Sequence, residues 1–326
     1  MNKIRSKRVV VVRGGPSEEY DVSMKTGAGV IEALQKLNYN YKDVIITRGG
    51  EWLDNGFARS PEQILQGYDV LFLALHGNFG EDGAVQRIAE RIGMPFTGSR
   101  AFPSSVALNK DLTKKHACEH GILTPEHLKV TRTGSANIAR TAAAIKEMFG
   151  PEYVIKPINS GSSLGTVLVY QHEDLTSKLQ EALQSYEEVM VEEMIRGKEG
   201  TVGVLEGFRD QKLYQLPSVE IIPPEENEFF DYECKYNGKT AEICPGRFSD
   251  QENKMMTDVA LKIHKTLGLT QYSRSDFMLR DGEVYFLEVN TLPGLTSESL
   301  LPKSLQAVGA SYEDLVEHLV ETAIVS

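Results

Sequence analysis

Apolar residues fall into alternating strand and helix patterns over the first hundred residues. The uninterrupted aliphatic run at 9–12 predicts a buried strand, and residues 22–37 carry apolar side chains at helical spacing. A second buried strand is predicted at 69–75, and an amphipathic helix at 83–93 ends at Gly93. Because strands joined by helices usually pair in parallel, this order predicts a parallel sheet with helices on its faces.

The pattern changes at about Asn109, where a compact α+β unit begins. Its helices and strands are predicted at 110–121, 136–150, 152–157, 165–170 and 188–195. From about residue 200, strand patterns lead through a long polar segment to helices near 253–268 and 312–323. The chain is therefore expected to form three domains, with boundaries at 1–108, 109–198 and 199–326.

Polar residues interrupt what otherwise looks like a buried hairpin near the C-terminal end. The segment DFMLRDGEVYFLEVNTLPG, residues 276–294, carries Asp276, Glu288 and Asn290 within its apolar strands. Strand alternation predicts two faces for the second strand, one with Val284, Phe286, Glu288 and Asn290 and the other with Tyr285, Leu287 and Val289. The acid and the amide of this strand should therefore project together.

The turn of the hairpin decides where Asp276 lies. A two-residue turn at 281–282 would place Asp276 opposite Leu287, so that it points away from Glu288. A three-residue loop at 280–282, with its glycine in the left-handed conformation, would bring the polar groups to one side. We predict the three-residue loop.

In that register Asp276 lies opposite Phe286 and Arg274 opposite Glu288. Two carboxylates and the amide oxygen of Asn290, gathered at one place, suit the hard octahedral ion Mg²⁺, which keeps waters and binds substrate phosphates. The alternative is an edge strand with a solvated polar face.

Lys156 stands at the end of a strand pattern and precedes a loop of small residues, Asn-Ser-Gly-Ser-Ser-Leu-Gly at 159–165. Such a loop offers N–H groups and hydroxyls that can close over phosphates, and the lysine supplies a point charge. It is not a Walker A motif, because a strand pattern follows it instead of a helix. A plain hairpin turn is the alternative.

Three weaker signals remain when each motif is taken alone. Glu192 and Glu199 flank a turn and could hydrogen-bond an adenine and a ribose, although acids around a surface turn are usually just solvated. His76 follows a buried strand, where open α/β sheets bind ligands, but a structural histidine capping the strand fits equally well. The Gly-Gly turn at 14–15 lacks the GxGxxG spacing of a dinucleotide site.

Composition limits the possible partners. The chain has 326 residues, 41% of them hydrophobic and 25% charged, as expected of an ordinary globular protein. Its net charge of −11, without a Lys/Arg tract, argues against nucleic acid or an anionic membrane as the main partner. No apolar stretch approaches a membrane span, and three cysteines without CxxC spacing predict neither a disulfide framework nor a zinc site. A cytoplasmic protein is expected, in which local basic groups meet any anionic ligand.

Taken in order, the motifs resemble those of one family, the D-alanine–D-alanine ligases of the ATP-grasp superfamily. The matching segments are GGPSEEYDVS, HGNFGEDG, PFTGS, YVIKPINSGSSLG, the stretch with Glu192 and Glu199, DYECKY, YSRSDF and LEVNTLPGLTSESL. The resemblance covers nearly the whole chain. It implies an ATP-grasp fold of α/β and α+β units in three domains, with a parallel sheet in the N-terminal one.

The resemblance also implies roles for individual residues. Its nucleotide and metal residues are Lys110 and Lys156 on the phosphates, Glu192 on the adenine, Glu199 on the ribose, and Asp276, Glu288 and Asn290 around two Mg²⁺ ions, with Mn²⁺ as an alternative. For the first D-alanine, it implies that Glu19 binds the ammonium in a hydrogen-bonded triad with Ser162 and Tyr236, and that His76 lies nearby. It further implies that Arg274 and the Gly294 N–H stabilise the oxyanion. The carboxylate of the second D-alanine would be bound by Lys235, Ser299 and the Leu300 N–H.

The implied activity is ATP-dependent ligation of two D-alanines through a D-alanyl phosphate, for peptidoglycan synthesis, by a homodimer. A D-alanine–D-lactate ligase is the nearest alternative, and Tyr236 argues against it. Another ATP-grasp carboxylate-amine ligase should lack the set of Glu19, His76 and Lys235. A catalytically silent nucleotide-binding protein is the remaining alternative, and the intact set of Asp276, Glu288, Asn290 and Arg274 argues against it.

Overall fold

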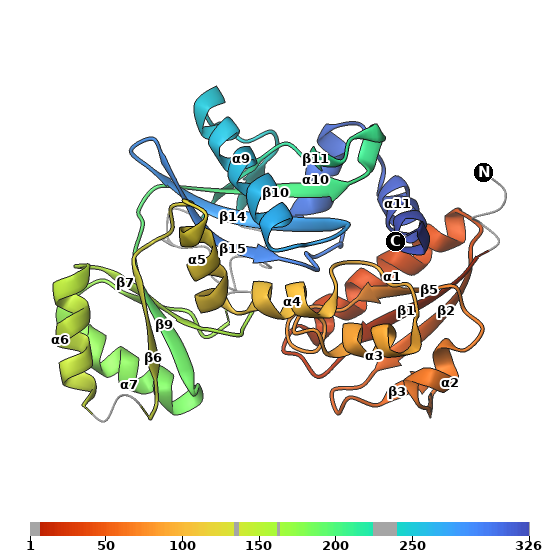
Figure 1. Ribbon diagram of the computed structural model, residues 1–326, viewed down its shortest axis with the longest axis horizontal. Coiled ribbons are helices and arrows are strands. Elements are labelled where there is room, and N and C mark those ends of the chain that lie inside the picture. The colour runs from red at the N-terminus through yellow and green to blue at the C-terminus, as the bar shows by residue number, and fades with distance from the viewer. Residues whose placement is uncertain (1–6, 134–136, 162–163, 224–239, 326) are drawn as a thin grey trace.

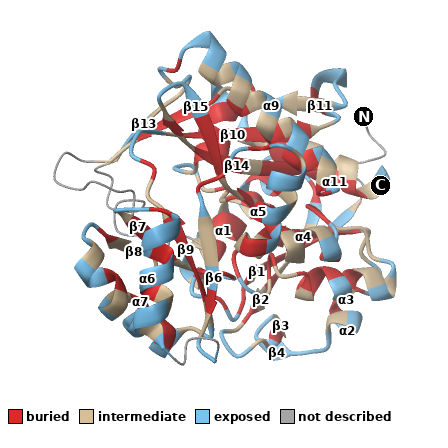
Figure 2. Ribbon diagram, turned by 60° about the vertical axis from the view of Figure 1, so that its left-hand side comes forward, coloured by how far each residue is buried: buried red, intermediate tan, exposed pale blue. Residues whose placement is uncertain are grey.

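The computed structural model describes residues 7–133, 137–161, 164–223 and 240–325, which form three β-sheets with helices packed around them (Figure 1). Buried residues concentrate in the strands and on the inner faces of the helices (Figure 2). No helix in these ranges is long and apolar enough to cross a membrane.

The N-terminal sheet has the strand order β4-β3-β2-β1-β5. Its strands are β1 (Arg8–Gly14), β2 (Asn40–Ile46), β3 (Trp52–Asp54), β4 (Phe57–Ala58) and β5 (Val70–Ala74). Strand β1 pairs in parallel with β2 and β5, whereas β3 and β4 extend the edge in antiparallel fashion. The predicted parallel sheet is therefore confirmed for β2, β1 and β5, the three neighbouring strands at one end of the sheet.

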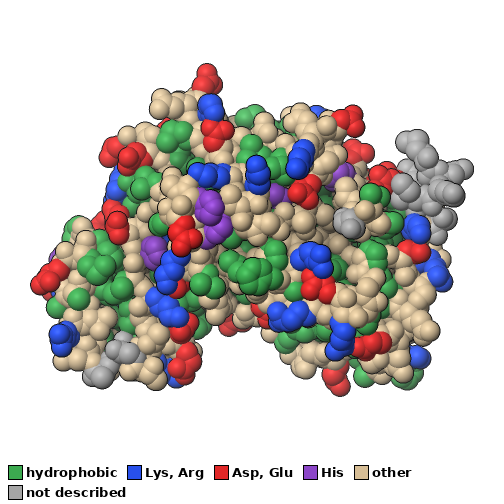
Figure 3. Space-filling model, viewed as in Figure 1, with side chains coloured by type: hydrophobic (Ala, Val, Ile, Leu, Met, Phe, Trp, Pro, Cys, Tyr) green, Lys and Arg blue, Asp and Glu red, His purple; other side chains and the backbone are tan. Residues whose placement is uncertain are grey.

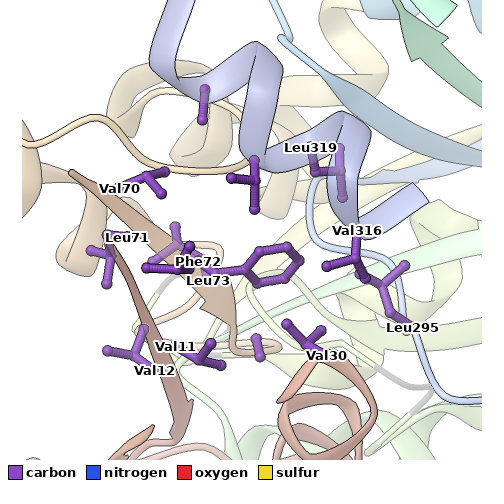
Figure 4. Close-up of a cluster of buried hydrophobic side chains, with 14 of the residues drawn as sticks. Val11, Val12, Val30, Val70, Leu71, Phe72, Leu73, Leu295, Val316 and Leu319 are labelled. Carbon is purple, nitrogen blue, oxygen red and sulfur yellow. The ribbon is translucent and has the colours of Figure 1, made fainter. Parts of the chain in front are cut away.

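Helices from both ends of the chain cover this sheet. They are α1 (Tyr20–Lys36), α2 (Pro61–Leu65), α3 (Ala84–Ile92) and the C-terminal helix α11 (Tyr312–Val325). Strand β1 is the uninterrupted valine run of the sequence, and those valines are fully buried. Figure 4 shows Phe72 of β5 between Val30 of α1 and Val316 of α11. The last helix thus closes the core that the first strand begins.

The central sheet has the order β6-β9-β7-β8 and is antiparallel throughout. Its strands are β6 (His127–Thr131), β7 (Tyr153–Pro157), β8 (Val167–Val169) and β9 (Glu188–Glu193). Helices α6 (Ile138–Met148) and α7 (Leu175–Ser185) share one apolar core with these strands, and the short helix η1 (His172–Asp174) directly precedes α7. This is the compact α+β unit that the sequence predicts.

The C-terminal sheet has the order β13-β12-β10-β14-β15, and β11 also pairs with β10. Its strands are β10 (Lys198–Glu206), β11 (Leu213–Gln215), β12 (Val219–Ile222), β13 (Ala241–Ile243), β14 (Tyr272–Arg280) and β15 (Glu283–Asn290). Its helices are α9 (Asp250–Thr266), α10 (Leu300–Ala307) and η2 (Phe208–Asp210). Helices α4 (Ala101–Leu108) and α5 (Lys110–Glu119) contact β15 and link this sheet to the other two (Figure 1).

The predicted register of the β14–β15 hairpin is wrong. Arg280 pairs with Glu283, so the turn is the two-residue Asp281-Gly282 turn, and both of its residues have the positive φ that such a turn requires. A β-bulge at Leu287 then shifts the ladder by one residue.

The bulge brings the polar residues together by a different route from the one predicted. Asp276 lies opposite Glu288 and Arg274 opposite Asn290, instead of Phe286 and Glu288 respectively. The alternation of β15 also changes at the bulge, because Phe286 packs into the apolar core together with Val289, away from the acids. The predicted grouping of side chains on the two faces of β15 is therefore wrong as well.

Candidate active site

Asp276 is the centre of a hydrogen-bonded cluster on the C-terminal sheet. Arg274 donates to both carboxylate oxygens, with Nε and Nη2 at 2.9 and 2.8 Å. Thr201 Oγ1 of β10 donates at 2.6 Å, and Asn290 Nδ2 of β15 donates at 3.0 Å. Burial would lower the pKa of Arg274, but the charge of Asp276 outweighs it and raises that pKa. A bidentate pair of this kind fixes the plane of the guanidinium.

Glu288, opposite Asp276, joins the C-terminal sheet to helix α5. Lys110 at the start of α5 approaches Glu288 Oε2 to 3.0 Å and donates to the carbonyl of Ser160 at 2.5 Å. Ser160 belongs to the small-residue loop after β7. Lys110 therefore connects the acids of the hairpin to the loop that follows Lys156.

Glu192 on β9 lies between two lysines. Its Oε1 is 3.1 Å from Lys114 Nζ of α5, and its Oε2 is 2.9 Å from Lys156 Nζ of β7. Burial would raise the pKa of Glu192, but the two ammonium groups lower it to about 2. Burial also lowers the pKa of Lys114, although the charge of Glu192 opposes that shift. Burial would lower the pKa of Lys156, but the carboxylates of Glu192 and Glu288 outweigh burial and raise that pKa.

Glu19 lies where the N-terminal sheet meets the central one. It directly precedes α1 and is almost buried. A Cβ atom added at Gly161 would come within 2.6 Å of Glu19 Oε2, and a Cβ atom added at Gly77 would clash with the same oxygen. The carboxylate therefore lies against the backbone of two loops, one after β5 and one after β7.

His76, directly after β5, is held in one neutral form. Its Nδ1 is 2.9 Å from the carbonyl of Leu292 and its Nε2 is 2.8 Å from Thr26 Oγ1. A carbonyl can only accept, so Nδ1 carries the proton and Nε2 accepts from the threonine hydroxyl. Burial lowers the pKa of His76 and favours this neutral form.

Glu81 joins the same loop to the segment after β15. Its Oε2 accepts the N–H of Gly77 at 2.9 Å, and its Oε1 accepts those of Thr291 and Leu292 at 3.0 and 2.9 Å. Burial, with a contribution from the charge of Glu19, raises its pKa to about 7.

The segment after β15 ends in an array of polar groups at the start of α10. Ser299 Oγ accepts the N–H of Thr296 at 3.1 Å, and a Cβ at Gly294 would lie 2.8 Å from that oxygen. Leu300 is the first residue of α10, so its N–H belongs to the helix terminus that has no partner within the helix. Such a terminus favours an anion.

Comparison with known proteins assigns a family to this arrangement. The family described as "D-ala D-ala ligase C-terminus" matches residues 117–321, and "D-ala D-ala ligase N-terminus" matches residues 54–99. The D-alanine–D-alanine ligase of Syntrophotalea carbinolica is 37% identical over 324 residues, which cover 98% of this chain and 97% of that one. The chain belongs to the D-alanine–D-alanine ligase family.

Solved structures agree with this family in fold. The D-alanine–D-alanine ligase from Bacillus anthracis complexed with ATP is 32% identical, with a TM-score of 0.80 and 98% of each chain covered. The VanG D-Ala:D-Ser ligase from Enterococcus faecalis is 29% identical, with a TM-score of 0.82, 98% of this chain covered and 99% of that one. The predicted ATP-grasp fold is therefore confirmed.

The structure gathers most of the residues that the resemblance to D-alanine–D-alanine ligases singled out. The hairpin set and Lys110 are in direct contact, and so are Lys156 and Glu192. Glu199 lies on β10, paired with Ile221 of β12. Three predicted residues lie outside the described ranges, namely Ser162, Lys235 and Tyr236.

Sequence reasoning missed three residues of this ligase site, Lys114, Glu81 and Thr201. Lys114 looks like one more charged residue of an amphipathic helix, yet it is fully buried. Glu81 lies in the HGNFGEDG motif, where only the histidine was singled out. The available signal for Lys114 was its position one helical turn after Lys110, which places both side chains on one face of α5.

Proposed function

We propose that this protein joins two D-alanine molecules into D-alanyl-D-alanine, with ATP converted to ADP and phosphate, as a step in peptidoglycan precursor synthesis. One observation carries the proposal. The polar face of the hairpin, with Arg274, Asp276, Glu288 and Asn290, meets Lys110 and the loop after Lys156 at the junction of the sheets. Family membership over the full chain supports the choice of substrates.

In the first step, a carboxylate oxygen of one D-alanine attacks the γ-phosphorus of ATP, so that an acyl phosphate forms and ADP leaves. Lys110 and Lys156 stabilise the charge on the phosphate oxygens and align them. We propose that Glu199 binds the ribose and Glu192 the adenine. Glu19, with Ser162 and Tyr236, holds the ammonium of this D-alanine, and His76 lies beside it.

Asp276, Glu288 and Asn290 have the donor chemistry for Mg²⁺, because two carboxylates and an amide on facing strands present hard oxygens to one space. No cluster of three or more His, Cys, Asp or Glu that could hold a metal occurs among the described residues, so a site of this composition needs the amide and the substrate phosphates. We propose two Mg²⁺ ions, with Mn²⁺ as an alternative. Bound there, they would neutralise phosphate charge.

In the second step, the free amine of the other D-alanine attacks the acyl carbon and phosphate leaves. We propose that Arg274 and the Gly294 N–H stabilise the oxyanion of the tetrahedral intermediate. A donor of this kind is typically worth about 10² to 10³ in rate. Lys235, Ser299 and the Leu300 N–H hold the carboxylate of the attacking D-alanine, consistent with the anion preference of a helix N-terminus.

The wider organisation is also a proposal. We propose domains of 1–108, 109–198 and 199–326, a homodimer, and a cytoplasmic location where ATP is available. The test of function is release of ADP with D-alanine, D-serine, D-lactate or L-alanine as substrate. We expect efficient turnover with D-alanine alone and D-alanyl-D-alanine as the product. Turnover that requires D-serine or D-lactate would show that this compound, and not a second D-alanine, is the acceptor. Absence of D-alanine-dependent ADP release would refute the proposal.

A further inference from the structure

Lys114 is a fully buried lysine in a contact set that joins helix α5 to the central sheet. Its ammonium lies 3.1 Å from Glu192 Oε1, close enough for an ion pair although not aligned as a hydrogen bond. The other oxygen of Glu192 receives a hydrogen bond of 2.9 Å from Lys156. One carboxylate thus serves two lysines, one from α5 and one from β7.

We propose that Lys114 is a positioning residue, a fixed counter-ion that allows Lys156 to leave Glu192 and bind the phosphates of the nucleotide. The inference rests on the proposed phosphate-binding role of Lys156. It assigns to Lys114 no contact with substrate, only an electrostatic action through Glu192.

The two lysines differ in how far they can move. The Lys114 side chain has no exposed surface and is enclosed, whereas 12% of the Lys156 side chain is exposed. Lys156 lies near the end of β7, three residues before the small-residue loop that begins at residue 159, so its partly exposed side chain is close in sequence to the proposed phosphate loop. Only Lys156 can exchange its partner for a ligand.

The exchange has an electrostatic cost that Lys114 removes. If Lys156 turned to a phosphate in a protein without Lys114, the buried carboxylate of Glu192 would lose its compensation. Breaking a buried ion pair by taking away one partner is strongly unfavourable, because the remaining charge is left in a medium of low polarity. Without Lys114, Lys156 should therefore stay on Glu192 and bind phosphate poorly.

Helix α5 is built to supply both cations. Lys110 and Lys114 are one turn apart, and they reach Glu288 in one sheet and Glu192 in the other. The adjacent Lys115 is 62% exposed and pairs with Asp111 of the same helix. Lys115 therefore offers a matched control, because Lys115→Met removes the same charge from the same helix by the same substitution.

The test compares the affinities of ADP and adenosine, measured by calorimetry, because their ratio isolates the phosphate contacts. Lys114→Met should weaken ADP binding by about 10- to 100-fold more than adenosine binding, the value of a charge-assisted hydrogen bond, and so lower the ratio of the two affinities by that factor. Lys115→Met should change neither. An unchanged ratio in folded Lys114→Met, or an equal loss for ADP and adenosine, would overturn the proposal.

A second variant keeps the test decisive even where Lys114→Met does not fold. Lys114→Met with Glu192→Gln removes both buried charges, so Lys156 is free to bind phosphate, and the wild-type ratio should return. Failure of the ratio to return would also overturn the proposal. Lys156→Gln tests the underlying function separately. If it leaves the ratio unchanged, the phosphate role of Lys156 itself is wrong, whatever the Lys114 variants do.

Discussion

The carboxylate of Glu81 should make the stability of the N-terminal sheet depend on pH in a direction unusual for an acid. Its side chain is 6% exposed and accepts three backbone N–H groups, two of them from the segment after β15. Burial and the charge of Glu19 raise its pKa from the ordinary 4.5 to about 7. The folded protein therefore holds a proton on Glu81 at pH values where the unfolded chain has released it.

The magnitude follows from the difference between the two pKa values. Each pH unit of difference is worth about 1.4 kcal/mol, so protonated Glu81 contributes about 3 kcal/mol to the free energy of unfolding. This contribution is fully present below pH 4.5 and is lost as the pH rises through 7, since the folded state must then bury the charge. Glu81→Gln stays neutral and should lack this dependence, although it loses one acceptor for a backbone N–H.

The single tryptophan, Trp52, is buried in the N-terminal sheet, so its fluorescence reports urea unfolding of this part of the molecule. The free energy of unfolding of wild type minus that of Glu81→Gln should fall by about 3 kcal/mol between pH 4.5 and 8. Any effect of the substitution on the free energy of unfolding that does not depend on pH cancels when this difference is compared between the two pH values. Glu181→Gln, which removes an exposed acid, is the control. Parallel curves for wild type and Glu81→Gln would refute the reasoning.

Three substitutions test the site itself. Glu288→Gln should abolish ADP release and leave Trp52 fluorescence unchanged, because it removes a metal-directed charge and little volume; normal release at ordinary Mg²⁺ would contradict the metal assignment. Arg274→Lys should leave ADP affinity unchanged and slow ligation by about 10²-fold, and unaltered ligation would make Arg274 only a partner of Asp276. Gly161→Ala places a Cβ against Glu19, so the KM for D-alanine should rise while ADP affinity stays the same; an unchanged KM would show that the loop has room to move.

The sequence predicted most helices and strands because their apolar periodicity matches the side of each element that is buried. Strand β1 and helix α3 lie where they were expected, and α3 ends at Gly93 in the left-handed conformation. Helix α4 was not predicted, since AFPSSVAL has a proline near its start and no clear polar face. The apolar pattern alone cannot distinguish such a short helix from a loop.

The hairpin shows how a correct grouping can follow from a wrong register. Alternation with period two places Phe286 and Glu288 on one face, and no residue in VYFLEVN signals that a bulge breaks the period. The bulge is a matter of tertiary packing, because Phe286 and Val289 both enter the core while Glu288 stays beside Asp276. The convergence of the acids was predictable from chemistry, and the path of the backbone was not.

Buried charges are the part of the site that sequence reasoning could least anticipate, and they explain how an acidic protein can receive an anionic nucleotide. The chain carries a net charge of −11, and acidic and basic side chains are interspersed over the face seen in Figure 3. The three contact sets at the junction of the sheets have a different balance. They hold four cations and three carboxylates, namely Lys110 with Glu288, Arg274 with Asp276, and Lys114 and Lys156 with Glu192.

These sets therefore sum to a charge of +1, in a place where water is scarce and charges act strongly over short distances. Each carboxylate is compensated by a cation from the protein, so the acids are held in place at little electrostatic cost before any ligand arrives. In the proposed complex with ATP and Mg²⁺, the lysines would turn to the phosphates and the hairpin carboxylates to the metal, so that each charge would exchange one partner for another. Under the proposed metal assignment, the incoming metal would balance the exchange at Glu288 and Asp276. No metal is expected at Glu192, so the balance there has to come from Lys114.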